Sequence, residues 1–203
     1  PRVRRQRQMC IRDSAYTNDT QTIWNGILGK IALTAKDKVR IEELRLTPNI
    51  DNQTVNVTVK IGSDDTALVS GKLRLSVKDP KGNKLPEREV EINSMETTFE
   101  YSVEDAMLWD EFTPNIYEAT ATLEVGNMTD SKSETFGMRK LTNKEALLQI
   151  NDRRLFLRGT LECCIFPLKG YPPTDNAGWE KVFNAARNYG LNPVSYTHLR
   201  AHE

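Results

Sequence analysis

The chain has 203 residues, of which 28 are Lys or Arg, 28 are Asp or Glu and two are His, so its formal net charge is zero. A chain of this length forms one or two domains. The sequence contains no run of about 18 apolar residues, which a membrane-spanning helix requires, and its N-terminus has no apolar segment typical of a signal peptide. The composition is that of a globular protein and excludes a membrane span.

The two ends of the chain differ in composition from the rest. Residues 1–13 hold five Arg and one Asp, and the last ten residues read VSYTHLRAHE. Both ends resemble translated adapter DNA of the kind used to prepare sequencing libraries, so we expect residues 1–14 and 193–203 to be artefactual tails on an internal fragment. A basic arm for nucleic acid or a membrane surface is the alternative interpretation. Without these ends the chain holds 22 basic and 26 acidic residues, a balance that indicates no nucleic-acid partner.

Both histidines lie in the expected tails, which leaves Cys163 and Cys164 as candidate metal ligands. Two adjacent cysteines lack the spacing of a zinc site, and a disulfide between them would need a strained ring. We therefore expect free thiols or small buried side chains, and no metal or cofactor.

Residues 15–36 are expected to form the closing edge of a preceding domain. Trp24-Asn25-Gly26 is a turn signal, and a short apolar strand follows at Lys30–Ala35. A single edge strand is marginally stable at best when alone, so its partners belong to strands outside this segment. Trp24 is expected to pack at a domain junction, with a platform for a ligand as the alternative.

Residues 37–140 have the pattern of a β-sandwich. In the clearest strand, Thr54–Ile61, Val55, Val57 and Val59 fall on one face and polar residues on the other. Gly, Pro, Asn and Asp cluster between the strands. The number and spacing of the strands predict an immunoglobulin-like fold. The seven expected strands are Val39–Leu46, Thr54–Ile61, Lys72–Lys78, Glu89–Ile92, Thr97–Val103, Tyr117–Val125 and Ser131–Arg139.

Aromatic residues stand out near the end of this segment. We expect Trp109 and Tyr117 to close one end of the sandwich and Phe136 to pack at a junction. They belong to the stretches Leu108-Trp109, Pro114–Tyr117 and Phe136-Gly137-Met138-Arg139.

Residues 141–192 change to a strand and helix pattern. Two short strands, Leu147–Ile150 and Leu155–Leu157, are joined by a tight turn that begins Asn-Asp. The second strand ends on Arg158-Gly159 and runs into an expected loop, Thr160–Pro173.

A helix is expected after this loop, with Thr174 or Asp175 as its N-cap and Gly190 as its C-terminal left-handed residue. Its apolar residues recur at i, i+3, i+4 and i+7. Strand, loop and amphipathic helix together indicate the first βα unit of a (β/α)8 barrel. The apolar positions are Trp179, Val182, Phe183 and Ala186.

Four stretches in this order resemble glycoside hydrolase family 2, the family of β-galactosidases, β-mannosidases and β-glucuronidases. The resemblance implies a sugar-binding jelly-roll edge at 15–36, a sandwich at 37–140 and the start of a catalytic barrel at 141–192. After Arg158-Gly159 the sequence departs from the Asn-Arg-His-Glu type segment of the best-known members, so the sugar specificity stays open. The stretches that carry the resemblance are residues 20–26, 108–117, 136–139 and 155–159.

Members of this family are retaining glycosidases, which use one Glu as the acid and a second as the nucleophile. In the family both lie on later barrel strands. The resemblance thus implies that this segment has no catalytic residue and is inactive alone, and that its parent acts on a β-linked oligosaccharide or polysaccharide. A periplasmic or secreted parent is a family-level expectation.

Three residues are candidates for a role at the substrate site of the parent. Arg158, at the C-terminal end of the expected strand Leu155–Leu157, would orient a catalytic carboxylate, with a structural ion pair as the alternative. Glu162 would line a sugar subsite, with a solvated loop carboxylate as the alternative. Tyr171 would stack on a sugar ring.

A non-catalytic carbohydrate-binding or adhesin-like module is the alternative function. Such a module explains residues 37–140 equally well. It does not explain why Arg158-Gly159 is followed by a capped amphipathic helix.

Overall fold

The computed structural model describes residues 31–64, 70–162, 168, 173–192 and 194–196. Residues Thr34–Leu155 form one compact unit. The described residues from Phe156 onward belong to a second unit.

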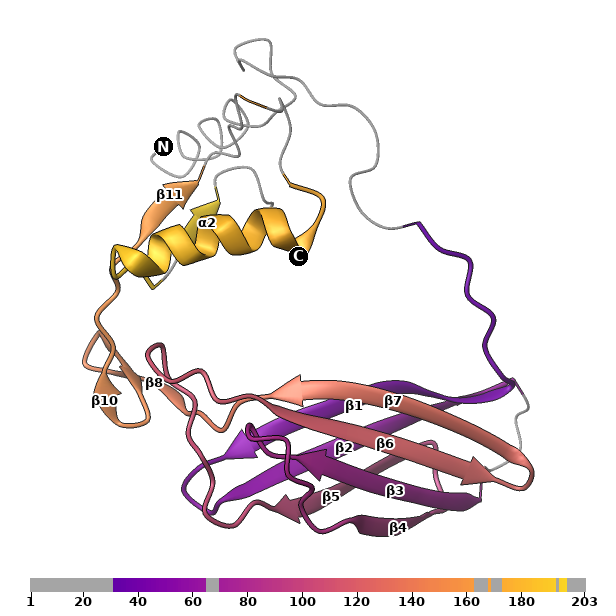
Figure 1. Ribbon diagram of the computed structural model, residues 1–203. Helices are drawn as coiled ribbons and strands as arrows, with labels where there is room; N and C mark the ends of the chain where they lie inside the picture. Colours follow the sequence, from indigo (N-terminus) through magenta and orange to yellow (C-terminus); the bar gives the residue numbers. More distant parts are fainter. Residues whose placement is uncertain (1–30, 65–69, 163–167, 169–172, 193, 197–203) are drawn as a thin grey trace, which may run out of the picture. The chain divides into compact units, whose positions relative to one another are not determined.

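The first unit is built on a two-layer β-sandwich (Figure 1). One sheet has the strand order β1-β2-β5 and the other the order β4-β3-β6-β7, and all neighbouring strands are antiparallel. All seven predicted strands are present. Their bounds are β1 Val39–Asn49, β2 Thr54–Ser63, β3 Gly71–Lys78, β4 Arg88–Ile92, β5 Glu96–Ser102, β6 Tyr117–Val125 and β7 Met128–Phe136.

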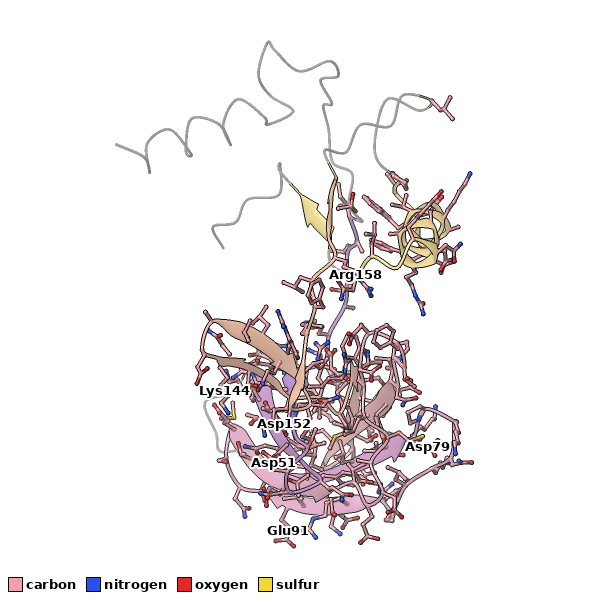
Figure 2. All side chains as sticks on the ribbon, turned by 90° about the vertical axis from the view of Figure 1, so that its left-hand side faces the viewer. Asp51, Asp79, Glu91, Lys144, Asp152 and Arg158 are labelled. Carbon is pink, nitrogen blue, oxygen red and sulfur yellow. The ribbon has the colours of Figure 1, made fainter. Side chains whose placement is uncertain are left out.

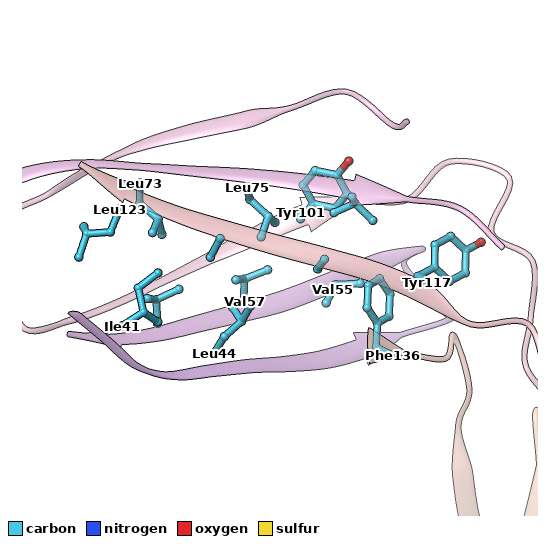
Figure 3. Close-up of a cluster of buried hydrophobic side chains, with 14 of the residues drawn as sticks. Ile41, Leu44, Val55, Val57, Leu73, Leu75, Tyr101, Tyr117, Leu123 and Phe136 are labelled. Carbon is cyan, nitrogen blue, oxygen red and sulfur yellow. The ribbon is translucent and has the colours of Figure 1, made fainter. Parts of the chain in front are cut away.

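The alternation in the sequence corresponds to burial between the sheets. Val55, Val57 and Val59 on β2 are at most 1% exposed. Val55 and Val57 face Leu73 and Leu75 of the opposite sheet across the core (Figure 3). Full burial of one such side chain contributes about 1.5–3 kcal/mol. No polar or charged side chain is buried among the described residues. The core is therefore a product of the period-two pattern.

β7 begins three residues before the predicted start at Ser131. Gly126, at a φ of +58°, and Asn127 form a two-residue turn, so Val125 already pairs with Met128. This two-residue turn is the whole connection between β6 and β7.

The edge strands β1 and β7, one from each sheet, are joined by side chains. β1 has an irregular register between Ile41 and Glu43, and Asp130 Oδ2 accepts a hydrogen bond from the Ile41 amide at 2.6 Å. Lys132 Nζ donates to the Glu42 carbonyl at 2.6 Å. Carboxylate and ammonium groups thus satisfy the backbone where the sheet ladder is interrupted.

A small antiparallel sheet follows, in the order β10-β9-β8. Ile150 in this sheet is 2% exposed. The sheet lies in the same compact unit as the sandwich, although the sequence analysis assigns residues 141–192 to the start of the barrel. Its strands are β8 Leu141–Lys144, β9 Leu147–Ile150 and β10 Arg153–Arg154.

The second unit contains a strand, a helix and a parallel strand: β11 Thr160–Glu162, α2 Asn176–Asn188 and β12 Val194–Tyr196. Asp175 is the N-cap and accepts a hydrogen bond from the Gly178 amide at 2.7 Å. Gly190 has a φ of +71° just after the helix, as predicted. The bounds of α2 therefore follow the caps seen in the sequence.

The strand predicted at Lys30–Ala35 is wrong for its described residues. Residues 31–37 have no strand, and Ile31 and Leu33 are 76% and 104% exposed. An apolar stretch forms a strand only beside another strand, and the described residues supply none here.

The strand predicted at Leu155–Leu157 is also wrong. Those residues have no strand assignment, and the next strand begins at Thr160, inside the expected loop. Phe156 and Leu157 are 63% and 53% exposed. The Leu155 amide donates to the carbonyl of Leu148 on β9, and the Phe156 carbonyl accepts from the side chain of Asn192.

Candidate functional site

The aromatic stretches of the sequence meet at one end of the sandwich. Gly137 stands against the indole of Trp109, and the guanidinium of Arg139 lies 4.4 Å from the centre of the same ring. The Trp109 amide donates to the carbonyl of Met138 at 2.8 Å. The chain after β7 is thereby fixed to the loop before β6, and the indole is held between a backbone and a cation.

Tyr117 and Phe136 form the inner layer of this end. Their rings stack with centroids 5.1 Å apart, and both side chains are buried. The Tyr117 hydroxyl accepts a hydrogen bond from the Met107 amide at 2.8 Å. Burial raises the pKa of this hydroxyl, so Tyr117 stays neutral and serves as packing. The expectation that Trp109 and Tyr117 close one end of the sandwich is confirmed. Phe136, which is expected at a junction, packs instead in the core of the sandwich.

Asn151 ties the small sheet to this end of the sandwich. Its side-chain nitrogen Nδ2 donates to the Trp109 carbonyl at 3.0 Å, and its side-chain oxygen accepts from the Lys140 backbone amide at 3.0 Å. Asn151 and Asp152 have φ values of 49° and 63°, as a tight turn requires. The sequence predicts the turn but not its contact with the sandwich.

Charged pairs support the same attachment. Lys140 Nζ lies 3.0 Å from both carboxylate oxygens of Asp51 and 3.3 Å from Asp152, and Figure 2 shows the two aspartates on neighbouring turns. The Lys140 pKa is raised, first by its hydrogen bond with Asp51. Arg153 donates to Glu111 at 2.8 Å, and the Glu111 side chain is 12% exposed. These contacts join the small sheet to the sandwich within the compact unit that ends at Leu155.

Arg158 lies in the segment that leads into β11 (Figure 2). Its side chain is exposed, and its backbone N–H and C=O are both hydrogen-bonded to Asn192. The Arg158 amide donates to Asn192 Oδ1 at 2.8 Å, and the Arg158 carbonyl accepts from the Asn192 amide at 3.0 Å. Arg158 therefore precedes the strand, and the expectation that it stands at a strand's C-terminal end is wrong.

Glu162 is the last residue of β11 and pairs with Tyr196 of β12. It belongs to a strand and not to the predicted loop, because a parallel neighbour is present to accept the ladder. Arg158 thus lies before the start of β11, and Glu162 lies at its C-terminal end. Trp24, Cys163, Cys164 and Tyr171 lie outside the described residues.

The helix α2 carries its apolar stripe without burying it. Trp179 and Phe183 stack at 5.8 Å, and the indole nitrogen of Trp179 donates to the Pro173 carbonyl at 2.8 Å. None of the helix residues is buried. The amphipathic pattern is confirmed as a helix, in which Trp179, Val182 and Ala186 are half-buried and Phe183 is 43% exposed. Among those residues, no helix has the length and apolar character needed to cross a membrane.

The family model for glycosyl hydrolases family 2 matches residues 39–139, which are the sandwich and its Phe136–Arg139 end. The chain belongs to this family. Two curated family 2 relatives are the β-galactosidases of Photobacterium profundum, 25% identical over 94% of this chain, and of Thermoanaerobacterium thermosulfurigenes, 24% identical over 73%. The chain spans only 20% and 22% of their lengths.

Solved structures agree with the family at the level of the fold. A β-glucuronidase of Parabacteroides merdae matches 77% of this chain and 20% of its own, with a TM-score of 0.63 and 18% identity. A family 2 member from Bacteroides cellulosilyticus matches 80% of this chain and 22% of its own, with a TM-score of 0.63 and 15% identity. The sandwich of family 2 enzymes is therefore the fold of the described chain.

Proposed function

We propose that the chain is the sandwich and the first barrel unit of a longer retaining β-glycosidase. The observation that carries this proposal is the order of two parts. A family 2 sandwich at 39–139 is followed by the strand β11 and the helix α2. A strand followed by a helix is the repeating element of a (β/α)8 barrel. A binding module made of a sandwich alone would not contain that element.

The chemistry proposed for the longer protein is double displacement. One carboxylic acid protonates the leaving oxygen, and a second carboxylate about 5–5.5 Å away attacks the anomeric carbon. In this family both glutamates come from later barrel strands than β11. The present chain, with one βα unit, is therefore proposed to hydrolyse no glycoside by itself.

Of the two candidate substrate-binding residues, Glu162 has the stronger support. It ends β11, and barrel enzymes bind substrates at the C-terminal ends of their strands. Arg158 precedes the strand, so a direct sugar contact requires its long side chain to reach past β11. We assign a sugar subsite to Glu162 and the pairing of a barrel carboxylate to Arg158.

The substrate class is proposed from the relatives' names. Those names include β-galactosidase and β-glucuronidase, which share a β-glycosidic bond and differ in the sugar. We propose a β-linked oligosaccharide or polysaccharide and leave the sugar open. The tails at 1–14 and 193–203 and the jelly-roll edge at 15–36 are part of the same proposal.

The test uses this chain and the longer reading frame that contains it. Both are assayed against p-nitrophenyl β-galactoside, β-glucuronide, β-mannoside and β-glucoside. We expect no hydrolysis by the chain and hydrolysis of at least one glycoside by the longer protein. In the longer protein, Glu162→Gln should raise KM at least about fivefold, roughly the loss of one hydrogen bond, while Glu180→Gln on α2 is the control.

Two results would refute the proposal. One is a longer reading frame that encodes no further βα repeats. The other is glycan binding by residues 34–155 together with a longer protein that hydrolyses nothing, because this is the behaviour of a carbohydrate-binding module.

A further inference from the structure

Asn192 makes three hydrogen bonds to the segment that leads into β11. Its side-chain nitrogen donates to the Phe156 carbonyl at 2.9 Å, and its side-chain oxygen accepts from the Arg158 amide at 2.8 Å. Its own amide donates to the Arg158 carbonyl at 3.0 Å. Donor and acceptor of one amide side chain are both used, and both backbone groups of Arg158 are satisfied by the same residue.

The position of Asn192 in the ladder explains why a side chain is needed. Arg158 and Asn192 are 34 residues apart, the same separation as in the pairs Thr160–Val194 and Glu162–Tyr196 of the parallel sheet. The next residue, Pro193, has no backbone N–H and cannot donate to a ladder. The side chain and the backbone N–H of Asn192 supply hydrogen bonds to Arg158 two residues before the Thr160–Val194 pair.

We propose that Asn192 is a positioning residue that fixes the backbone of Arg158 at the entry to β11. The inference rests on the proposed function for its biological meaning, because it concerns a candidate site residue. These hydrogen bonds thus fix the backbone position from which the Arg158 side chain extends.

The geometry separates this role from general support of the unit. Asn192 contacts the strand segment, whereas α2 has its own caps at Asp175 and Gly190. Removing the Asn192 side chain should free the Arg158 backbone amide from its acceptor and leave the helix α2 unchanged. A residue with a merely structural role would instead loosen the segment and the helix together.

The test is hydrogen exchange of individual amides in the full chain, measured by NMR. In Asn192→Ala, the Arg158 amide should exchange about tenfold faster, the loss of one hydrogen bond. The amides of α2 should keep their rates within about twofold, a bound set by the scatter of single-bond effects. Asn192→Asp keeps the acceptor, so the Arg158 amide should stay close to its original rate.

Asn184→Ala is the matched control, because Asn184 is an exposed asparagine on α2. It should leave the Arg158 amide unchanged. Equal Arg158 rates in Asn192→Ala and the unaltered chain would overturn the inference, and so would an equal loss of protection across α2. Exchange needs no glycosidase activity, so failure of the proposed function would not alter either outcome.

Discussion

Gly137 leaves no room for a side chain beside Trp109. A Cβ at Gly137 would lie 2.9 Å from both Cβ and Cγ of the Trp109 side chain. Such contacts require a shift of the indole or of the backbone. Because Arg139 lies over the same ring, a shift would also disturb the cation–π pair.

Gly137→Ala should therefore destabilise the sandwich by about 1–3 kcal/mol, the usual cost of overpacking. Urea unfolding monitored by tryptophan fluorescence measures this change. Gly62→Ala is the control, since a Cβ there meets only the flexible side chain of Glu42. Equal losses in both variants would show that the indole is not the obstacle.

The sandwich could be predicted because its information is local. Alternation along Thr54–Ile61 and similar strands is caused by burial on one face, and turn residues mark the ends. The helix could be predicted for the same reason, since Asp175 and Gly190 cap it within the sequence itself.

The error at Leu155–Leu157 has a different cause. An apolar run looks like a strand, but a strand also needs a neighbour. The Leu155 amide continues the β9–β10 pairing by donating to Leu148, whereas the Phe156 carbonyl accepts from the side chain of Asn192, so no one strand runs beside the whole segment. No pattern in the sequence links Arg158 to a residue 34 positions away, so Asn192 could not be found as its partner.

Asp130 should prove important for the closure of the sandwich edge. Asp130→Ala would leave the amide of Ile41 without its carboxylate acceptor, at 2.6 Å in the intact chain. A lost bond to a charged group destabilises by about 1.5–3 kcal/mol. Chemical unfolding checks this value, and Asp64→Ala, which removes an exposed carboxylate, should cost less than about 1 kcal/mol.

Stability should fall in acid because three carboxylates have lowered pKa values in the folded chain. The Asp79 pKa is lowered first by the Asn83 side chain, the Glu43 pKa by Lys60, and the Glu89 pKa by Lys72. The unfolded chain binds these protons more readily, so the stabilisation is present above the ordinary carboxyl pKa and is lost as the pH falls through the lowered values.

Unfolding midpoints measured from pH 6 down to pH 3, a range that brackets ordinary carboxyl pKa values, should therefore decrease. Asp79→Asn should flatten this dependence, because the substituted amide does not titrate. A dependence on pH as steep in Asp79→Asn as in the unaltered chain would rule out a contribution from Asp79.

The β8–β9 turn holds two residues that are not glycine at positive φ. Glu145 has a φ of 48° and Ala146 a φ of 63°, and both are exposed. A non-glycine residue in this region costs of order 1 kcal/mol. Glu145→Asn with Ala146→Gly, the preferred sequence for this turn, should raise the free energy of unfolding by about 1 kcal/mol. Thermal and urea unfolding would both register it, and a lower midpoint would contradict the strain.

The stable unit should extend beyond the sandwich to Leu155. Residues 38–140 contain the seven strands and should unfold cooperatively when produced alone, since they close their own core. Residues 34–155 add buried Ile150 and the bonds from Asn151 to Trp109 and Lys140. Burial of the Ile150 side chain alone contributes about 1.5–3 kcal/mol, so the longer piece should be the more stable by at least that amount.

Urea unfolding of the two pieces measures the difference directly. Asn151→Ala in residues 34–155 should remove part of it, whereas Asn143→Ala, which changes an exposed asparagine on β8, should not. In the full chain the amides of α2 should exchange faster than those of β2, β3 and β6, because none of its residues is buried. Protection of Trp179–Ala186 equal to that of the core strands would mean that the apolar stripe is covered.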